Sequence, residues 1–248
     1  MGFDIALMVV GALIAIVGFY ATLVSLWLMV KYIKFNRMEN SAGLSGKEVA
    51  RKILDDNGLE HIKVKVTGSL LFGNSYSHYF KKVRLRRFTR NEKSLTSLGI
   101  GAQKASLAIL DKEGDPEMKK RIRLYPLITF GPFMFVPLLL IGALLDYFVF
   151  NQTGYIVLAM GGLGVLFYVY ALVLSVLTLK TEKKAQAKSY EILKKDKLVT
   201  NEELELLKDL FHLYNVQYIN DIILSSLELI RVAIQIAATF KDASTSKS

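Results

Sequence analysis

Long uncharged stretches alternate with strongly charged ones along this chain, and the uncharged stretches predict membrane helices. Residues 5–30 contain no charged side chain. As a helix they would be about 39 Å long, enough to cross about 30 Å of hydrocarbon. Residues 125–150 carry one charge, Asp146, and residues 155–179 carry none. Only residues 151–154 separate these two stretches, so we expect a transmembrane helical hairpin over 125–179.

The last apolar stretch, residues 213–240, differs because polar side chains recur in it at helical spacing. The polar stripe consists of Asp221, Ser225, Glu228, Arg231, Gln235 and Thr239. Such a helix either crosses the membrane with its stripe against other helices or lies in the interface, and we favour the first arrangement. Glu228 and Arg231 are three residues apart, which allows an ion pair. Residues 241–248 form a polar tail.

The segment 31–124 has shorter patterns, which predict a small α+β domain. Residues 45–57 form an amphipathic helix that starts with a capping box, Ser45 with Glu48, and stops at Gly58. Its inward side chains are Val49, Ile53 and Leu54. Residues 62–66 and 82–88 alternate in polarity like strands, and residues 95–110 form a largely apolar helix. A second charged segment, 180–212, is expected to be helical.

Basic residues flank the apolar stretches on one side only, which predicts the orientation in the membrane. They are Lys31, Lys34, Arg37, Lys119, Lys120, Arg121, Arg123, Lys180, Lys183 and Lys184. Because cytoplasmic loops carry an excess of Lys and Arg, residues 31–124 and 180–212 are expected inside, and the N-terminus and hairpin tip outside. The predicted fold is therefore mainly α: a multi-span helical membrane protein with residues 1–30 as its first span and a small α+β cytoplasmic domain.

Charge and composition restrict the chemistry. The segment 31–124 holds 21 Lys/Arg and 10 Asp/Glu, a net charge of +11 against +10 for the whole chain. Six of its cations lie within ten residues: Lys81, Lys82, Arg84, Arg86, Arg87 and Arg90. With apolar stretches on both sides, we expect this cluster to face anionic lipid head groups or an acidic partner, and no nucleic acid. The chain has no cysteine, and its three histidines include no pair four residues apart, so neither thiolate chemistry nor a histidine metal cluster is indicated.

Several segments resemble the YugP-type membrane zinc metallopeptidases. Residues 43–59 (GLSGKEVARKILDDNGL) are similar to the opening helix of that family, which follows a first span. His78 and Tyr79 stand where the family has a His-Tyr pair. Residues 177–182 (LTLKTE) resemble the run that ends in the third zinc ligand, here Glu182. The order of spans and motifs agrees over nearly the full length.

The resemblance fails at the zinc helix, within residues 95–110. The family's HExxH motif supplies two imidazoles four residues apart and a glutamate base. Gln103 stands at the first histidine, Lys104 at the glutamate and Leu107 at the second histidine, so Glu182 alone remains of the expected ligands. A lysine would repel a metal ion, so we expect no cofactor and no catalytic residue. Lys104 could pair with Glu182 instead, and Leu107 should pack as a core residue.

The resemblance, together with the absence of the zinc-binding motif, implies a pseudopeptidase. Such a protein would be a scaffold or accessory subunit that binds another membrane protein or complex, in a bacterial inner or plasma membrane. Two alternatives stay open. One is a membrane-bound hydrolase with non-standard or metal-free chemistry. The other is a transport component, suggested only by the polar stripe of residues 213–240. Separately from these alternatives, His78 and Tyr79 are candidates for a binding cleft, although such a pair is more often structural or solvated.

Overall fold

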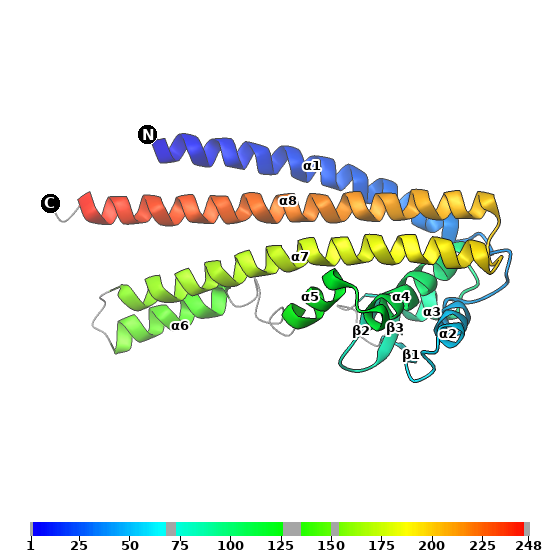
Figure 1. Ribbon diagram of the computed structural model, residues 1–248. Coiled ribbons are helices and arrows are strands. Elements are labelled where there is room, and N and C mark those ends of the chain that lie inside the picture. Colours follow the sequence, from blue (N-terminus) through cyan, green and yellow to red (C-terminus); the bar gives the residue numbers. More distant parts are fainter. Residues whose placement is uncertain (1, 68–72, 126–134, 150–153, 246–248) are drawn as a thin grey trace. The chain divides into compact units, whose positions relative to one another are not determined.

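The chain is mainly helical in the computed structural model, with helices α1 to α8 and one small sheet (Figure 1). The structure describes residues 2–67, 73–125, 135–149 and 154–245. The chain divides into two compact units. The helical unit consists of residues 1–23, 123–176 and 218–248, and the α+β unit consists of residues 24–122 and 177–217.

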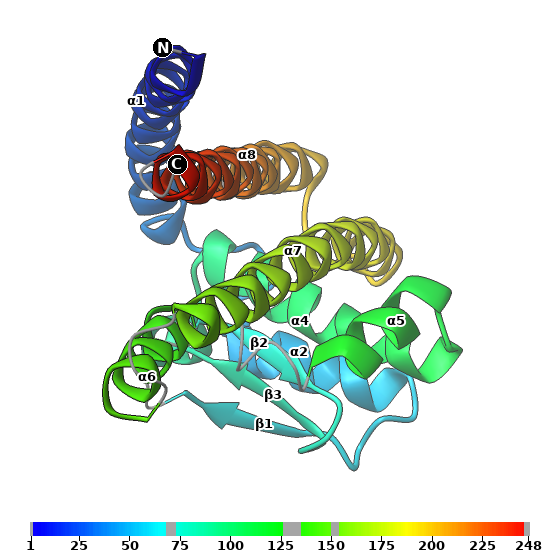
Figure 2. The same cartoon turned by 90° about the vertical axis from the view of Figure 1, so that its left-hand side faces the viewer.

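The α+β unit is built on a three-stranded sheet in the order β1 (Lys63–Val66), β3 (Lys82–Leu85), β2 (Ser75–Ser77). The central strand β3 runs parallel to β1 and antiparallel to β2. Helices α2 (Gly46–Asp56) and α4 (Leu95–Glu113) pack against one face of this sheet (Figure 2). This confirms the small α+β fold expected for the segment.

Local sequence explains where α2 begins and ends. The Ser45 hydroxyl accepts a hydrogen bond from the Glu48 backbone N–H, and the Glu48 carboxylate accepts one from the Ser45 N–H, which completes the predicted capping box. Gly58 takes a left-handed φ of 64° just after the helix, a conformation that glycine adopts without a Cβ penalty. The predicted inward residues Val49, Ile53 and Leu54 are fully buried.

Two glycines bring α2 and α4 into backbone contact. A Cβ built on Gly101 of α4 would lie 2.4 Å from the carbonyl oxygen of Gly46 and 2.9 Å from Val49 Cγ1. A Cβ on Gly46 would in turn lie 2.0 Å from the Thr89 carbonyl oxygen. No larger residue fits at either position unless the helices separate. Gly101, in the segment that resembles the zinc helix, therefore serves close packing against α2.

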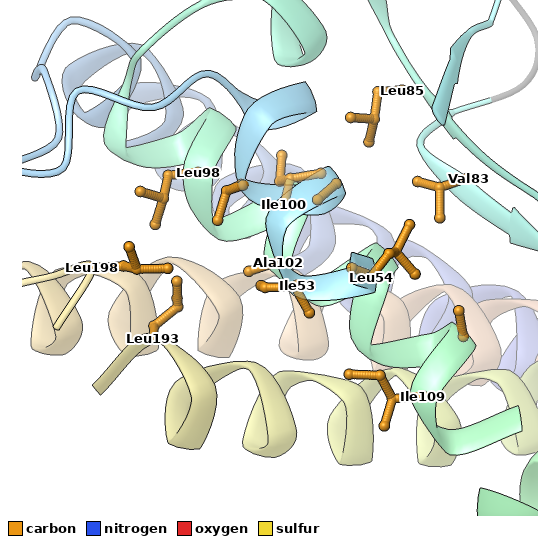
Figure 3. Close-up of a cluster of buried hydrophobic side chains, with 14 of the residues drawn as sticks. Ile53, Leu54, Val83, Leu85, Leu98, Ile100, Ala102, Ile109, Leu193 and Leu198 are labelled. Carbon is orange, nitrogen blue, oxygen red and sulfur yellow. The ribbon is translucent and has the colours of Figure 1, made fainter. Parts of the chain in front are cut away.

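Apolar side chains from four helices and the sheet fill one core in the α+β unit (Figure 3). Ile53 and Leu54 come from α2, Leu98 and Ile109 from α4, and Leu193 from α7 (Tyr155–Lys195). Members from the sheet and from α8 (Asn201–Thr245) are Val83, Leu85, Leu207 and Phe211. Because this core joins segments far apart in sequence, the position of α4 against α7 is fixed by packing.

The strand predictions succeed only in part. β1 confirms the strand expected over residues 62–66, but β3 ends at Leu85, short of the predicted end at Phe88. Arg87–Asn91 forms a short helix, α3, and Phe88 in it is 68% exposed, so the alternating pattern continues beyond the strand without burial. The strand β2 was not predicted because its three residues alternate too briefly, and it exists through pairing with β3.

In the helical unit, α1 (Gly2–Asn36) and α7 are, among the described helices, the two long and apolar enough to cross a membrane. Few of their large apolar side chains are buried and many are exposed, for example Ile16 and Leu166, each at 66%. Exposure of this kind is typical of a lipid-facing surface and would be costly in water. The helices therefore support membrane association, as expected for residues 5–30 and 155–179.

Of the transmembrane hairpin expected over 125–179, the structure describes the helix pair α6 (Phe135–Phe148) and α7, in which α7 is long and apolar enough to cross a membrane and α6 is a shorter apolar helix. Gly142 of α6 approaches α7 so closely that a Cβ there would lie 2.9 Å from Val157 Cα. Pro137 falls in the first turn of α6, where its missing N–H costs no helical hydrogen bond. The tip residues 151–153 lie outside the described residues.

The two segments expected after the hairpin are parts of longer helices. α7 continues without a break to Lys195, and α8 runs from Asn201 through both 201–212 and the polar stripe to Thr245. The predicted pair Glu228 and Arg231 is present, with 2.7 Å between Arg231 Nη2 and Glu228 Oε2. No boundary near residue 212 is visible in α8.

Candidate functional site

The vestigial site predicted from the zinc-helix resemblance is brought together where α4 faces α7 in the α+β unit. Gln103 and Lys104 are neighbours on α4, and both reach the carboxylate of Glu182 on α7. Gln103 Nε2 donates to Glu182 Oε2 at 2.9 Å, and Lys104 Nζ donates to the same oxygen at 2.7 Å. The ion pair between Lys104 and Glu182, which the sequence left open, is present in the structure.

A second cation, which the sequence did not reveal, completes the site. Arg121 of α5 (Pro116–Leu124) lies with Nη2 3.3 Å from Glu182 Oε1 and donates through Nη1 to the Thr181 hydroxyl at 2.7 Å. Both oxygens of the Glu182 carboxylate therefore face a positive charge. The sequence analysis included Arg121 only among the basic residues that predict the membrane orientation. Glu182 is 61 positions away, and no local sequence pattern indicated that the two residues interact.

The site is enclosed, and this determines its electrostatics. The side chains of Lys104, Arg121 and Glu182 are 11%, 13% and 16% exposed. Burial alone would raise the pKa of Glu182, but the Lys104 ammonium and the Arg121 guanidinium outweigh it and hold that pKa below its usual value. Glu182 lies beyond the uncharged part of α7. Because its pKa is lowered, its carboxyl group is ionised at neutral pH.

These donors do not fit a zinc ion. Protein zinc sites use about three nitrogen, sulfur or carboxylate ligands, and a carboxylate already bonded to two cations and an amide is not free to serve. Among the described residues, no group of three or more His, Cys, Asp or Glu side chains is arranged to hold a metal. Instead, the carboxylate of Glu182 is paired with two cations, Lys104 and Arg121.

Leu107, at the position of the second family histidine, is fully buried and packs with Leu110, Met118 and Ala185. The prediction that it is an ordinary core residue is confirmed. Leu107 therefore takes part in the apolar contacts between α4, α5 and α7.

His78 lines a separate pocket, while its neighbour Tyr79 does not. The pocket has a volume of about 240 Å³ and its lining includes His61, Lys81, Asp111 and Lys112. His78 Nδ1 and the Tyr76 hydroxyl each lie 2.6 Å from Asp111 Oδ2. Burial raises the pKa of Tyr76, and its hydrogen bond to Asp111 adds to this, so the phenol donates.

The Tyr79 hydroxyl donates to the Ile122 carbonyl at 2.9 Å, at the end of α5, so the predicted His-Tyr cleft contains only the histidine. Asp111 and Tyr76 were missed. Asp111 stands eight residues after Gln103 on the same helix, but nothing in the sequence marked it as a partner of His78.

The six clustered cations divide between two places. Lys82 and Arg84 lie on β3, on the face opposite the buried Val83 and Leu85. Both lie over the ring of Phe80, Lys82 Nζ at 4.4 Å and the Arg84 guanidinium carbon at 5.5 Å from its centroid. The remaining four, in the turn before β3 and at α3, are Lys81, Arg86, Arg87 and Arg90.

Comparison with known proteins agrees with the family resemblance. The family described as "Putative neutral zinc metallopeptidase" matches residues 7–237, so the chain belongs to this family. A similar protein is the "Putative membrane protease YugP" of Bacillus subtilis (strain 168), 26% identical over 212 residues, which cover 84% of this chain and 89% of that protein. No solved structure matches.

Proposed function

We propose that this member of the metallopeptidase family does not hydrolyse peptides and acts as a scaffold or accessory subunit of a membrane protein complex. The observation that supports this proposal most directly is that two cations, Lys104 and Arg121, pair with the carboxylate of Glu182. The general base position of the motif holds a lysine, and a protonated lysine cannot accept a proton from water.

The surrounding framework supports a retained structural role. The contact of Gly46 with Gly101 holds the capped helix α2 against α4, and the buried Leu107 packs α4 against Ala185 of α7. Breaking a buried ion pair costs far more than its formation stabilises, so Lys104, Arg121 and Glu182 depend on one another. A site of this kind holds helices in place and leaves outer surfaces for a partner.

The proposed location is a membrane that the chain crosses several times, with the α+β unit in the cytoplasm and the N-terminus outside. Its support is the distribution of basic residues around the apolar stretches and the exposed apolar surface of α1 and α7. Further partners are expected to be membrane lipids and another membrane protein.

Metal analysis and activity of the purified full-length protein test the proposal. We expect far less than one zinc per chain after exposure to zinc and removal of excess, and no cleavage of unfolded casein with added zinc. One zinc per chain that Glu182→Ala abolishes, together with casein cleavage, would overturn it. The matched control is Glu205→Ala, which removes a carboxylate that is 70% exposed.

A second candidate function, metal-free hydrolysis, is favoured by the His78 and Asp111 pair in its pocket. A proton on Nδ1 would be donated to Asp111, which would leave Nε2 as a base for water. Turnover of a fluorogenic peptide or ester library that is lost in His78→Ala and kept in His212→Ala would support this function. No turnover in any variant would exclude it for those substrates.

A further inference from the structure

The register of the sheet gathers four cations on one face, which the sequence alone did not reveal. Lys63 is aligned with Lys82, and Lys65 with Arg84, across the parallel strands β1 and β3. Val83 and Leu85 on β3 point to the core, so their alternate neighbours point away from it. We call Lys63, Lys65, Lys82 and Arg84, together with Phe80, the outer sheet face.

These charges repel one another in the free protein. Neighbouring strands lie about 4.8 Å apart and alternate residues about 6.6 Å apart, both shorter than the Debye length of about 8 Å at physiological salt. Like charges in register on adjacent strands are destabilising. In the described part of the chain, none of the four forms an ion pair with an acidic side chain.

An exposed apolar ring lies beside two of these cations. Phe80 is 66% exposed and is approached by Lys82 and Arg84. Cations around an exposed aromatic side chain fit the head-group region of a bilayer, where charge meets phosphate and rings reach the acyl boundary.

We propose that the outer sheet face docks on an anionic lipid bilayer. Charge complementarity is the main argument: four uncompensated cations match a surface of negative head groups. The second argument is continuity, since the same chain carries two helices apolar enough to cross a membrane, so a bilayer surface is within reach of the tethered α+β unit. This proposal is independent of whether the protein is a peptidase.

A site-specific label in nanodiscs tests the proposal with the full-length protein. The chain has no cysteine, so Ser75→Cys introduces a unique one on β2, in register with Arg84 and on the same face. A spin label there is compared in nanodiscs of phosphatidylcholine alone and with phosphatidylserine added. We expect access of a water-soluble relaxation agent to fall at least about twofold with phosphatidylserine, and to recover in 1 M salt, where the Debye length is about 3 Å.

Two quadruple variants with the same change in net charge distinguish an effect of the outer sheet face from an effect of net charge. Lys63→Gln, Lys65→Gln, Lys82→Gln and Arg84→Gln together should abolish the lipid-dependent protection, with an unfolding midpoint no lower than that of the parent because a repulsion has been removed. The control replaces four exposed lysines elsewhere in the α+β unit, Lys47, Lys194, Lys195 and Lys208, by Gln and should keep the protection.

Three outcomes would overturn the proposal. Equal access in both kinds of nanodisc would show no role for anionic lipid. Loss of protection in the control would show that net charge alone acts. Stronger protection by an RNA duplex in phosphatidylcholine nanodiscs than by phosphatidylserine would assign the face to a soluble polyanion.

Discussion

Lys104 Nζ lies 2.7 Å from Glu182 Oε2, across 78 positions of sequence, with both side chains less than one fifth exposed. The contact joins α4 to α7, and Arg121 of α5 approaches the other oxygen of the same carboxylate. Three helices of the α+β unit therefore meet at one carboxylate, and its loss leaves two enclosed cations without a counter-charge.

Glu182→Gln should lower the free energy of unfolding by about 3–5 kcal/mol, the usual cost of breaking a buried pair from one side. Chemical unfolding of the full-length protein in detergent, followed by circular dichroism, measures the loss. The control Glu205→Gln removes an exposed partner of Lys208 and should change stability by less than about 0.5 kcal/mol. Equal effects of the two variants would contradict the proposed contribution of the Glu182 ion pairs to the free energy of unfolding.

Restoring the motif should restore metal binding. Gln103→His, Lys104→Glu and Leu107→His together place two imidazoles on α4 opposite Glu182 and remove the nearest cation. We expect the triple variant to bind about one zinc per chain, measured by calorimetry and elemental analysis. The single variant Lys104→Glu serves as control and should not bind zinc. A folded triple variant without zinc would show that Glu182 is not placed to act as the third ligand.

Gly101→Ala should destabilise the protein even though alanine is the better helix former by about 1 kcal/mol. The new Cβ would meet the Gly46 carbonyl oxygen at 2.4 Å, so α2 and α4 must separate and lose core contacts. The control Gly162→Ala has no atom within 4 Å of the added Cβ and should be neutral or stabilising. Unfolding midpoints of the two variants provide the comparison.

Stability should fall on acidification below about pH 4, the ordinary range of carboxyl pKa values. Burial would raise the pKa values of Glu182, Asp115 and Glu203, but their partners (the two cations, Lys184, and the Ser41 and Thr200 hydrogen bonds) hold them lowered in the folded state. A lowered folded pKa contributes stability that is present above the unfolded pKa and lost as pH falls through the folded one.

Unfolding midpoints between pH 7 and pH 3 test this dependence. Glu182→Gln should start less stable at pH 7 and lose less between the two pH values than the parent protein. A parallel loss in both would mean that other groups control the acid sensitivity.

Topology is tested by labelling single cysteines from one side of the membrane. Ser75→Cys in the α+β unit should react from the cytoplasmic side, and Tyr155→Cys, at the exposed start of α7, from the outside. An impermeant maleimide on intact cells and on inverted vesicles measures both. Reaction of both cysteines from the same side would contradict the orientation derived from the basic residues.

Local sequence was sufficient for the features that depend on neighbouring residues. The capping box of Ser45 and Glu48, the stop at Gly58, and the long apolar runs of α1 and α7 involve residues within one turn or one continuous stretch. The end of β3 at Leu85 and the existence of β2 were not predicted, because strand pairing depends on partners outside the local pattern.

Only the tertiary structure decided which charges meet. The sequence alone suggested that Lys104 could pair with Glu182, through the family motif, but Arg121 became part of the site because the packing of α5 places it there. In the same way, Lys63 and Lys65 joined Lys82 and Arg84 through the parallel register of β1 and β3. Electrostatic partners are set by distances of a few ångströms in space, and those distances follow from core packing, which no single segment specifies by itself.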